Sequence, residues 1–426
     1  MLANYSSIFS LLRGTAFLLA ASGLHNLLLP LRGQAEGFST FSLGLLGTAY
    51  AGGFVAGCVF APRLVRRVGH VRAFGTFAAS AAIIVLFTGL VVNEEAWVLS
   101  RICSGFVMAG AFMVTESWLN EKATNENRGT LFGLYMMVTY ASIMAGQMTV
   151  AAFEIGQGEL FMVCGILFCC SVIPTAVSIA GTPQPLQEVS LDLRGLFANS
   201  PVSVVACLLI GVANGAWGTL GAVYGARIGI STAEIALMMS LVVVTGAAMQ
   251  MPVGRLSDVT DRRYILAGSA LFAALIGCLI FFIESRSGVT VILLAGGYGS
   301  MAYILYSLAV AHANDHADTS SFVKISSGLL LLYGFGTIIG PMLGSALMTQ
   351  LRPEALFLAT ALPHFLLACY TMLRVSKRAP VPLENKEAFN VLPSERAVTP
   401  QAMLLDPRGP EESTSPVAET AAPASL

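Results

Sequence analysis

The chain carries two short basic segments, Pro62-Arg63-Leu64-Val65-Arg66-Arg67-Val68-Gly69-His70 and Gly254-Arg255-Leu256-Ser257-Asp258-Val259-Thr260-Asp261-Arg262, which begin 254 − 62 = 192 residues apart. Each segment lies between two long apolar runs, at the same place in its half of the chain. A turn that recurs between matching apolar runs predicts that the chain consists of two copies of one membrane unit.

The composition excludes an ordinary soluble protein. Of the 426 residues, 55% are hydrophobic and 11% are charged, and the mean hydropathy is +0.75. A soluble domain has about 25% charged residues. Crossing a bilayer takes about 20 apolar residues of helix, whereas a barrel strand shows an alternation over about ten residues. The apolar runs have the helical length, so we predict an all-α integral membrane protein.

The apolar runs number twelve, six in each half. They cover residues 8–31, 41–61, 73–92, 96–118, 129–152, 159–180, 201–223, 231–253, 264–284, 289–312, 324–349 and 354–375. We therefore predict a six-helix bundle over residues 1–180, a cytoplasmic interdomain loop over 181–200 and a second six-helix bundle over 201–376. Prolines are scattered among acidic and small residues over 377–426, which predicts a disordered cytoplasmic tail there.

Lysine and arginine in the short loops predict the orientation. Fourteen lie on the side of both termini, namely Arg63, Arg66, Arg67, Arg72, Lys122, Arg128, Arg194, Arg255, Arg262, Arg263, Lys324, Arg374, Lys377 and Arg378. Only Arg32, Arg227, Arg286 and Arg352 lie on the other side. We expect both termini in the cytoplasm.

The two basic segments resemble the loop G-x-L-a-D-R-x-G-R-K of the major facilitator superfamily. In the second half Gly254, Leu256, Asp258, Arg262 and Arg263 are in register with it. In the first half Leu64, Arg67 and Gly69 match, but Arg66 occupies the acidic position. The resemblance implies a cytoplasmic gate that latches helix ends together and releases them. The alternative is that these arginines only fix the topology and bind anionic headgroups.

Two further stretches resemble the uncharacterised bacterial YcaD-like branch of this superfamily. They are Ala311-His312-Ala313-Asn314-Asp315, followed by Ser326 to Gly334, and Glu116 to Glu121, followed by Asn127-Arg128-Gly129. The resemblance covers nearly all of residues 8–376 and implies twelve transmembrane helices, and a bacterial relative implies the cell inner membrane. Neither stretch indicates a substrate.

One arginine is predicted to lie deep in the fourth span. Arg101 and Gly105 resemble the R-x-x-x-G signature of the superfamily, which implies that the arginine faces the central cavity. At the 192-residue offset their counterparts are Leu293 and Gly297, so the glycine is repeated and the charge is not. This difference favours a role for Arg101 in binding over a structural salt bridge.

Other polar residues are predicted at similar depth, namely His25 and Asn26 in the first span, Gln147 in the fifth and Asn214 in the seventh. The resemblance implies that spans one, four and seven line the cavity, so His25, Arg101 and Asn214 could converge there. Hydrogen bonds between helices are the alternative for each. His25 is also a candidate for proton coupling.

Glu116 follows Arg101 by fifteen residues, about 22 Å along a helix, and is predicted near the cytoplasmic boundary. With Arg128 it could belong to the cytoplasmic gate, and the alternative is a proton-carrying carboxylate.

The eleventh span has small residues at Gly336, Gly340, Pro341 and Gly344, which predicts close helix packing. In antiporters of the superfamily such a motif lies in the fifth span, where this chain lacks it.

We find no nucleotide, metalloprotease or hydrolase motif, and none of the eight cysteines has a metal or disulfide spacing. We therefore expect no enzymatic activity, no cofactor, no metal and no nucleic-acid partner. The sequence predicts a secondary active transporter of a small solute, anionic or zwitterionic, which works by alternating access in the bilayer and is coupled to a proton or another ion. The alternatives are an exporter of amphiphilic compounds and a non-transporting sensor or scaffold of the same fold.

Overall fold

The computed structural model describes residues 2–124, 126–177, 192–318, 321–392 and 398–405. The first half contains α1 (Leu2–Ala35), α2 (Thr40–Val68), α3 (His70–Leu90), α4 (Glu94–Lys122), α5 (Arg128–Thr149), the short turn η1 (Val150–Ala152) and α6 (Glu159–Val177). The second half contains α7 (Leu193–Asn199), α8 (Pro201–Ile228), α9 (Thr232–Val259), α10 (Arg262–Ile283), α11 (Gly288–Ala302), α12 (Leu305–Asn314), α13 (Phe322–Gln350), η3 (Pro353–Ala355) and α14 (Leu356–Val375). Two further turns follow, η4 (Leu383–Asn385) and η5 (Pro400–Leu405).

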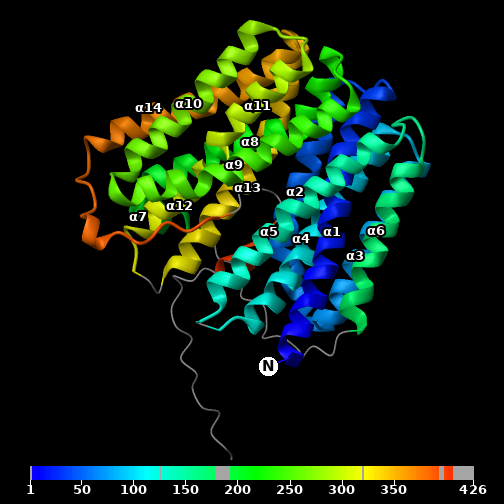
Figure 1. Cartoon of the computed structure of the whole chain (residues 1–426), viewed down its shortest axis with the longest axis horizontal. Helices are drawn as coiled ribbons and strands as arrows, with labels where there is room; N and C mark the ends of the chain where they lie inside the picture. Colours follow the sequence, from blue (N-terminus) through cyan, green and yellow to red (C-terminus); the bar gives the residue numbers. More distant parts are fainter. Residues whose placement is uncertain (1, 125, 178–191, 319–320, 393–397, 406–426) are drawn as a thin grey trace, which may run out of the picture.

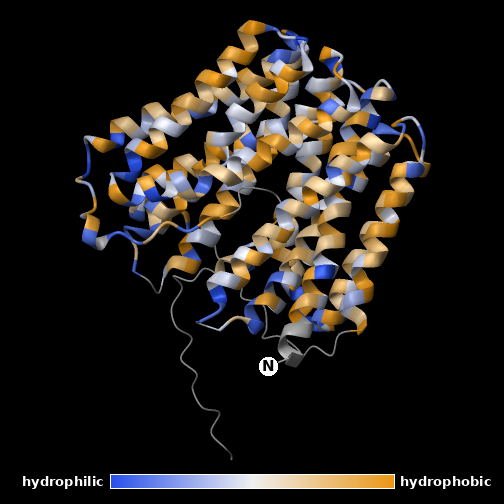
Figure 2. Cartoon of the chain, in the orientation of Figure 1, coloured by the Kyte–Doolittle hydropathy of each residue, from blue (hydrophilic) through white to orange (hydrophobic). Residues whose placement is uncertain are grey.

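The predicted fold class is confirmed. Twelve helices of the described residues are long and apolar enough to cross a membrane. Apolar residues cover the middle of the helices and polar residues gather at their ends and in the loops (Figure 2). Several helices exceed the predicted spans, as α2 does by ending at Val68 instead of residue 61. A helix continues its backbone hydrogen bonds beyond the hydrocarbon layer, whereas an apolar run ends with that layer.

The helices form two groups, α1–α6 and α8–α14, which lie beside each other (Figure 1). The helices of each group run alternately up and down, so the turns that follow α2 and α9 lie on the same side as the N-terminus. We call this side the terminal face and the other side the opposite face.

The tenth predicted span is present over Gly288–Asn314, but it consists of two helices. Residues 289–312 were expected to form one helix, but the helix breaks between α11 and α12 at Tyr303 and Ile304. The residues before the break are rich in glycine, with Gly296, Gly297 and Gly299. Each glycine weakens a helix by about 1 kcal/mol relative to alanine, so the free-energy cost of interrupting the helix there is small.

The structure also corrects the interdomain loop. Its last part forms α7, which begins where the Asp192 carboxylate accepts the backbone N–H of Gly195 at 2.9 Å. The side chain of Leu196 is buried against Gly328 of α13. Residues 181–191 lie outside the described residues.

The expectation of a disordered tail is wrong for the described part of residues 377–405. This part runs from α14 along the terminal face and ends between the two groups of helices (Figure 1). Leu392, Ala402, Met403 and Leu405 are completely buried. Proline-rich composition indicated a lack of autonomous structure, but apolar residues spaced along the segment find partners on the helices. Residues 406–426 lie outside the described residues.

Glycines set the helix spacing inside each group. A Cβ added to Gly105 of α4 would lie 2.1 Å from the Tyr50 carbonyl oxygen of α2. On α13, a Cβ at Gly336 or Gly340 would lie 2.2 or 2.1 Å from a carbonyl oxygen of α8, and one at Gly344 would lie 2.9 Å from the Leu220 side chain. Pro341 is buried on the same helix. These backbones therefore touch directly, as small-residue stripes allow.

Candidate solute-binding cavity

A cavity of about 110 Å³ lies between the two groups of helices. Both halves contribute to its lining, which consists of Asn26, Leu29, Pro30, Leu46, Gly47, Tyr50, Arg101 and Gln147 from the first half, and Asn214, Gly218, Thr219, Met239, Val243, Tyr303 and Tyr333 from the second. Tyr303 lies at the break between α11 and α12, so the break gives the cavity part of its wall.

Arg101 is the charged residue among the described residues that line the cavity, and no carboxylate of these residues lines it. Its side chain is 6% exposed. Nη2 donates to Asn26 Oδ1 at 3.1 Å, Nε donates to the Leu46 carbonyl oxygen at 3.5 Å, and the guanidinium carbon lies 4.1 Å from the centre of the Tyr50 ring. Asn26, the Leu46 carbonyl and the Tyr50 ring thus help to hold the guanidinium at the cavity wall.

Polar groups of the second half complete the lining. Asn214 Nδ2 donates to the Tyr333 hydroxyl at 3.4 Å, and Asn214 Oδ1 has no hydrogen-bond partner among the described residues. The same holds for Thr219 Oγ1. Gln147 Oε1 accepts from the Ser240 hydroxyl at 3.1 Å, which ties α5 to α9 beside the cavity. A buried oxygen without a partner costs free energy that a bound solute can recover.

The structure brings together three of the four residues predicted for binding, Arg101, Gln147 and Asn214. His25 is buried but does not line the cavity, so its predicted convergence with Arg101 and Asn214 is wrong for this structure. The next residue, Asn26, lines the cavity instead, because one residue turns the helix by about 100°. The sequence analysis missed the three tyrosines, since a tyrosine in an apolar run gives no signal of its own.

The 192-residue offset between the halves does not hold at the glycine that corresponds to Gly105. Gly297, the counterpart of Gly105 at the 192-residue offset, has no atom within 4 Å of an added Cβ. Gly299 makes the close contact instead, since its Cβ would lie 2.5 Å from the Val242 carbonyl oxygen. The matching offset on these helices is 299 − 105 = 194, so the repeat slips by two residues between the basic turn and this contact.

Contacts between the two halves lie on the opposite-face side of the cavity. Thr48 Oγ1 donates to the Ile338 carbonyl oxygen at 2.7 Å, and a Cβ at Gly44 would lie 2.6 Å from the Ser345 side chain. Farther out, Arg227 Nε donates to Gln34 Oε1 at 3.1 Å and joins α8 to α1. The two halves therefore meet on this side of the cavity.

The residues predicted for a gate in the second half form an ion-pair cluster at the terminal face. Arg262 is 1% exposed, and its guanidinium lies 2.9 Å from the Asp258 carboxylate and 2.6 Å from that of Asp315. Burial raises the pKa of Asp315 above its usual range, although the hydrogen bonds and charge of Arg262 oppose this. The sequence analysis quoted Asp315 in a family stretch without assigning it to the gate.

Arg263 pairs with Asp261 at 2.7 Å and donates to the carbonyl oxygens of Arg374, in the last turn of α14, and of Arg378, just beyond this helix. Burial pushes the pKa of Asp261 upward, but the hydrogen bonds and charge of Arg263 outweigh it and hold this pKa below its usual range. The cluster thus ties α9, α10 and α14 together.

In the first basic turn, Arg67 differs from its counterparts in the second half. Arg67 is exposed, and no carboxylate of the described residues lies within ion-pair distance of it. Gly69 joins α2 to α3 with a φ of 84°, a conformation that favours glycine. Arg67 therefore shares its position in the repeat with the second turn but not the buried ion pairs of Arg262 and Arg263.

The predicted pair of Glu116 and Arg128 is not formed among the described residues. Glu116 is completely buried, and its carboxylate accepts hydrogen bonds from Tyr135 and Thr399, while Arg128 is half-buried. Among the described residues no group of three or more His, Cys, Asp or Glu side chains could hold a metal ion.

The sequence matches the Major Facilitator Superfamily over residues 11–327 and 202–408. The chain belongs to the major facilitator superfamily. It is 26% identical over 381 residues to a protein of Salmonella arizonae named "Uncharacterized MFS-type transporter YcaD", and the alignment covers 88% of this chain and 97% of that protein. The predicted YcaD-like branch is thereby confirmed, and the chain is a membrane transporter of this superfamily.

Solved structures of other transporters share its fold. A mutant form of the nucleoside transporter NupG has a TM-score of 0.71 at 14% identity, over 87% of this chain and 100% of that one. A bacterial homologue of the human lysosomal transporter Spinster, in an inward-facing and occupied conformation, has a TM-score of 0.68 at 14% identity, over 89% and 97%. At such identities the likeness concerns the fold.

Proposed function

We propose that this transporter is a secondary carrier that moves a small anionic or zwitterionic solute by alternating access, coupled to a proton or another ion. The observation that carries the proposal is Arg101, which is the charged lining residue of a cavity without a carboxylate. Burying an arginine inside a membrane costs several kcal/mol. An anionic group of the solute would offset part of this cost, and a cationic solute would increase it.

The other lining residues fit a small polar solute. Asn214 and Thr219 line the same cavity as the arginine, and their side chains carry oxygens that accept hydrogen bonds. Tyr50, Tyr303 and Tyr333 offer flat apolar surfaces that shield it from lipid. The contacts between the halves toward the opposite face support a cycle in which that side is closed in the present state.

We further propose that the terminal face is cytoplasmic, because basic loop residues gather on this face. A fluorescent protein that folds only in the cytoplasm, fused after Leu426, should fluoresce in a bacterial host. A dark fusion of normal abundance would contradict this orientation.

Thermal unfolding of the purified protein and its Arg101→Ala variant tests the solute class. A panel of anionic metabolites, neutral sugars and amphiphilic cations is added in turn. A ligand at one hundred times its dissociation constant stabilises the folded state by about 2.7 kcal/mol. We expect an anion to stabilise the parent and not the variant. Equal stabilisation of both proteins by amphiphilic cations alone would overturn the anion assignment.

A further inference from the structure

The described end of the tail lies between the two halves. The turn η5 packs against α4 and α5 of the first half and against α13 of the second. Its side chains are buried there, as are those just before it, namely Val398, Thr399, Pro400, Gln401, Ala402, Met403 and Leu405. This segment fills a slot at the terminal-face side of the cavity.

In the first half the segment satisfies a buried carboxylate. The Thr399 backbone N–H donates to Glu116 Oε1 and Oε2 at 3.0 and 3.2 Å, and the Thr399 hydroxyl donates to Oε2. Tyr135 donates to Oε1 at 3.2 Å. Glu116 is completely buried, so these donors replace water around the carboxylate. Removing the segment leaves this carboxylate with Tyr135 and whatever water enters the slot.

In the second half the segment binds the gate cluster. The Phe389 backbone N–H donates to the Asp258 carboxylate at 3.0 and 3.2 Å, and the Glu387 N–H donates to Asp315 Oδ1 at 3.2 Å. Arg262 Nη2 donates to the Glu387 carbonyl oxygen. Asp258 and Arg262, which were predicted for the gate, thus hold the tail together with Asp315.

An aromatic ring of the segment packs directly against Gly254. A Cβ added to Gly254 would lie 2.1 Å from Phe389 Cδ1, so the ring rests directly on the α9 backbone. Farther along, the Leu392 N–H donates to Ser307 Oγ at 3.0 Å, and this hydroxyl donates to the Leu392 carbonyl oxygen at 2.7 Å. The segment is therefore anchored at several points of the second half.

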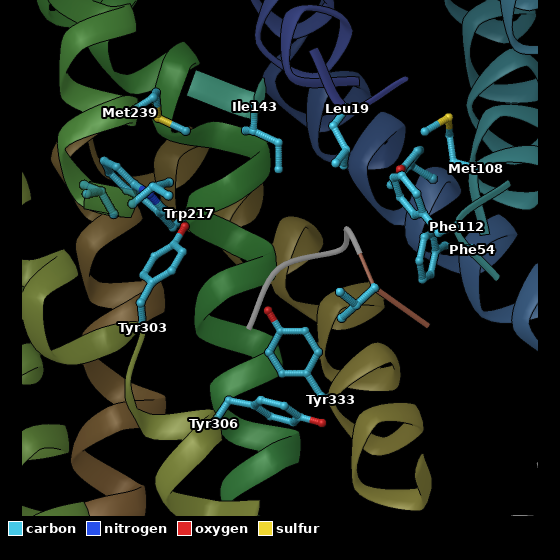
Figure 3. Packing of buried hydrophobic residues seen from close by; sticks show 14 of the residues in the cluster. Leu19, Phe54, Met108, Phe112, Ile143, Trp217, Met239, Tyr303, Tyr306 and Tyr333 are labelled. Atoms are coloured by element: carbon cyan, nitrogen blue, oxygen red, sulfur yellow. The ribbon is translucent and has the colours of Figure 1, made fainter. Parts of the chain in front are cut away.

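The segment also lies across the route from the cavity to the terminal face. Val398 and Pro400 close a second, small apolar cavity together with Phe54 and Cys58 of α2 and Tyr333 of α13. Tyr333 lines the central cavity as well, so the two spaces adjoin at this ring. Figure 3 shows Tyr333 and Phe54 on opposite sides, with the red-brown end of the described tail between them.

We propose that residues 383–392 and 398–405 form an intramolecular plug, which occupies the slot and must leave it before the cavity can open to the terminal face. This inference rests on the proposed carrier function, because a plug matters only where a solute passes. While it is bound, the plug links Glu116 of the first half to the Asp258–Arg262–Asp315 cluster of the second. It thereby holds the terminal-face ends of the two halves together and inhibits release of solute on that side.

Cys58 provides a native reporter that does not depend on transport. It is buried on α2 beside Val398 and Pro400, so a maleimide reaches it only when the plug has left the slot. The other seven of the eight cysteines are replaced by alanine, and the rate of Cys58 labelling is measured in detergent. We expect slow labelling of this parent and about tenfold faster labelling after truncation behind Val381.

Two point changes test the plug in the full chain. Phe389→Asp places a carboxylate beside Asp258, and in Gly254→Ala the added methyl group collides with the Phe389 ring. Both changes should weaken binding of the plug and speed up Cys58 labelling. The matched control is Gly268→Ala on α10, because an added Cβ there meets no atom within 4 Å. A second control ends the chain behind Leu405, which leaves the plug intact. Both controls should label at the parent rate.

A synthetic peptide of residues 383–405 added to the truncated protein should restore slow labelling, whereas a peptide with Thr399→Pro, which lacks the donated N–H, should not. Rapid labelling of the parent, or equal rates with and without the plug, would overturn the proposal. The plug and the solute class can be rejected independently. If truncation speeds up Cys58 labelling but no anion stabilises the protein, the plug is supported and the anionic solute class is rejected. If an anion stabilises the parent only and truncation leaves the labelling rate unchanged, the solute class is supported and the plug is rejected.

Discussion

At the scale of single residues, the site depends on how Arg101 is held. Asn26 accepts from Nη2, and the Tyr50 ring covers the guanidinium carbon, so two neutral groups help to orient the charged group. A carboxylate in place of Asn26 would neutralise the guanidinium and remove its attraction for an anion. A neutral acceptor positions it and leaves the attraction intact.

The first prediction concerns Asn26. Replacement by alanine removes the acceptor of Nη2, and a hydrogen bond to a charged group contributes about 1.5–3 kcal/mol. We expect the Asn26→Ala variant to bind the anion identified by thermal unfolding about tenfold more weakly, since part of this loss is recovered by water. His25→Gln changes the adjacent buried residue, which does not line the cavity, and should leave the affinity unchanged. An equal loss of anion affinity in the two variants would contradict a specific role of Asn26 in positioning Arg101.

The second prediction concerns pH and Asp261. Its pKa in the folded state is held below the usual value by Arg263, although burial acts in the opposite direction. The ionised carboxylate therefore contributes stability above its unfolded-state pKa of about 3.9, and this contribution disappears as the pH falls through the lower folded-state pKa. The stability difference between the parent and Asp261→Asn should be constant from about pH 7 to pH 5 and shrink below about pH 4. Thermal unfolding across this range measures it, and a difference that persists undiminished at about pH 3 would contradict the argument.

At the scale of elements, glycine contacts set the geometry of the helix pairs. The α8 and α13 pair meets at backbone distance along a stripe that ends near the cavity, where Asn214 and Tyr333 face each other. A wider crossing would move these two side chains apart. The packing glycines thus influence the site without touching it.

The third prediction follows from this crossing. In Gly340→Ala the new methyl group would lie 2.1 Å from the Val212 carbonyl oxygen, so the helices must separate. We expect a loss of about 1–3 kcal/mol of stability, seen as a lower unfolding temperature in detergent. Gly297→Ala is the matched control, because its methyl group meets no atom within 4 Å. Similar losses in the two variants would show that helix propensity, and not the close contact, governs the effect.

The same elements show how far a sequence repeat predicts a structure. The basic turns predicted two matching halves, and the twelve helices agree with this. The offset of 192 nevertheless selected Gly297 instead of Gly299, and it missed the break at Tyr303. Helix contacts depend on which residues face each other after the chain has packed. A shift of two residues between the repeats changes these contacts but leaves the apolar pattern of the sequence unchanged, so the pattern does not reveal it.

At the scale of the whole molecule, the two sides of the cavity are closed in different ways. Toward the opposite face the halves touch directly, through Thr48 and Ile338 and through Gln34 and Arg227. Toward the terminal face the tail bridges α4 and α5 to α13. Opening the opposite face requires the halves to rock apart, whereas the tail can leave the terminal face while the halves keep their contacts.

The fourth prediction tests this asymmetry. Gln34→Cys and Arg227→Cys are introduced together and joined by a short bifunctional maleimide, which fixes the opposite face in its closed state. We expect uptake of the identified anion into proteoliposomes to stop, because the cavity can no longer open on that side. Each single cysteine variant, treated alike, should transport normally. Undiminished uptake by the cross-linked pair would contradict alternating access in this protein.

The sequence by itself determined the membrane environment, the twelve helices, the two-half organisation and the family. These features depend on composition, on the length of apolar runs and on a short motif, all of which act locally along the chain. It also indicated Arg101, since a lone charge in an apolar run is costly wherever the helix packs.

Only the tertiary structure decided which neighbours these residues meet. The rotation of α1 turned Asn26 and not His25 toward the cavity. The partner of Glu116 proved to be Thr399, 399 − 116 = 283 residues away, in a stretch whose composition indicated disorder. Contacts between segments so distant in sequence depend on packing of the whole chain, and no local pattern of charge or hydrophobicity encodes them.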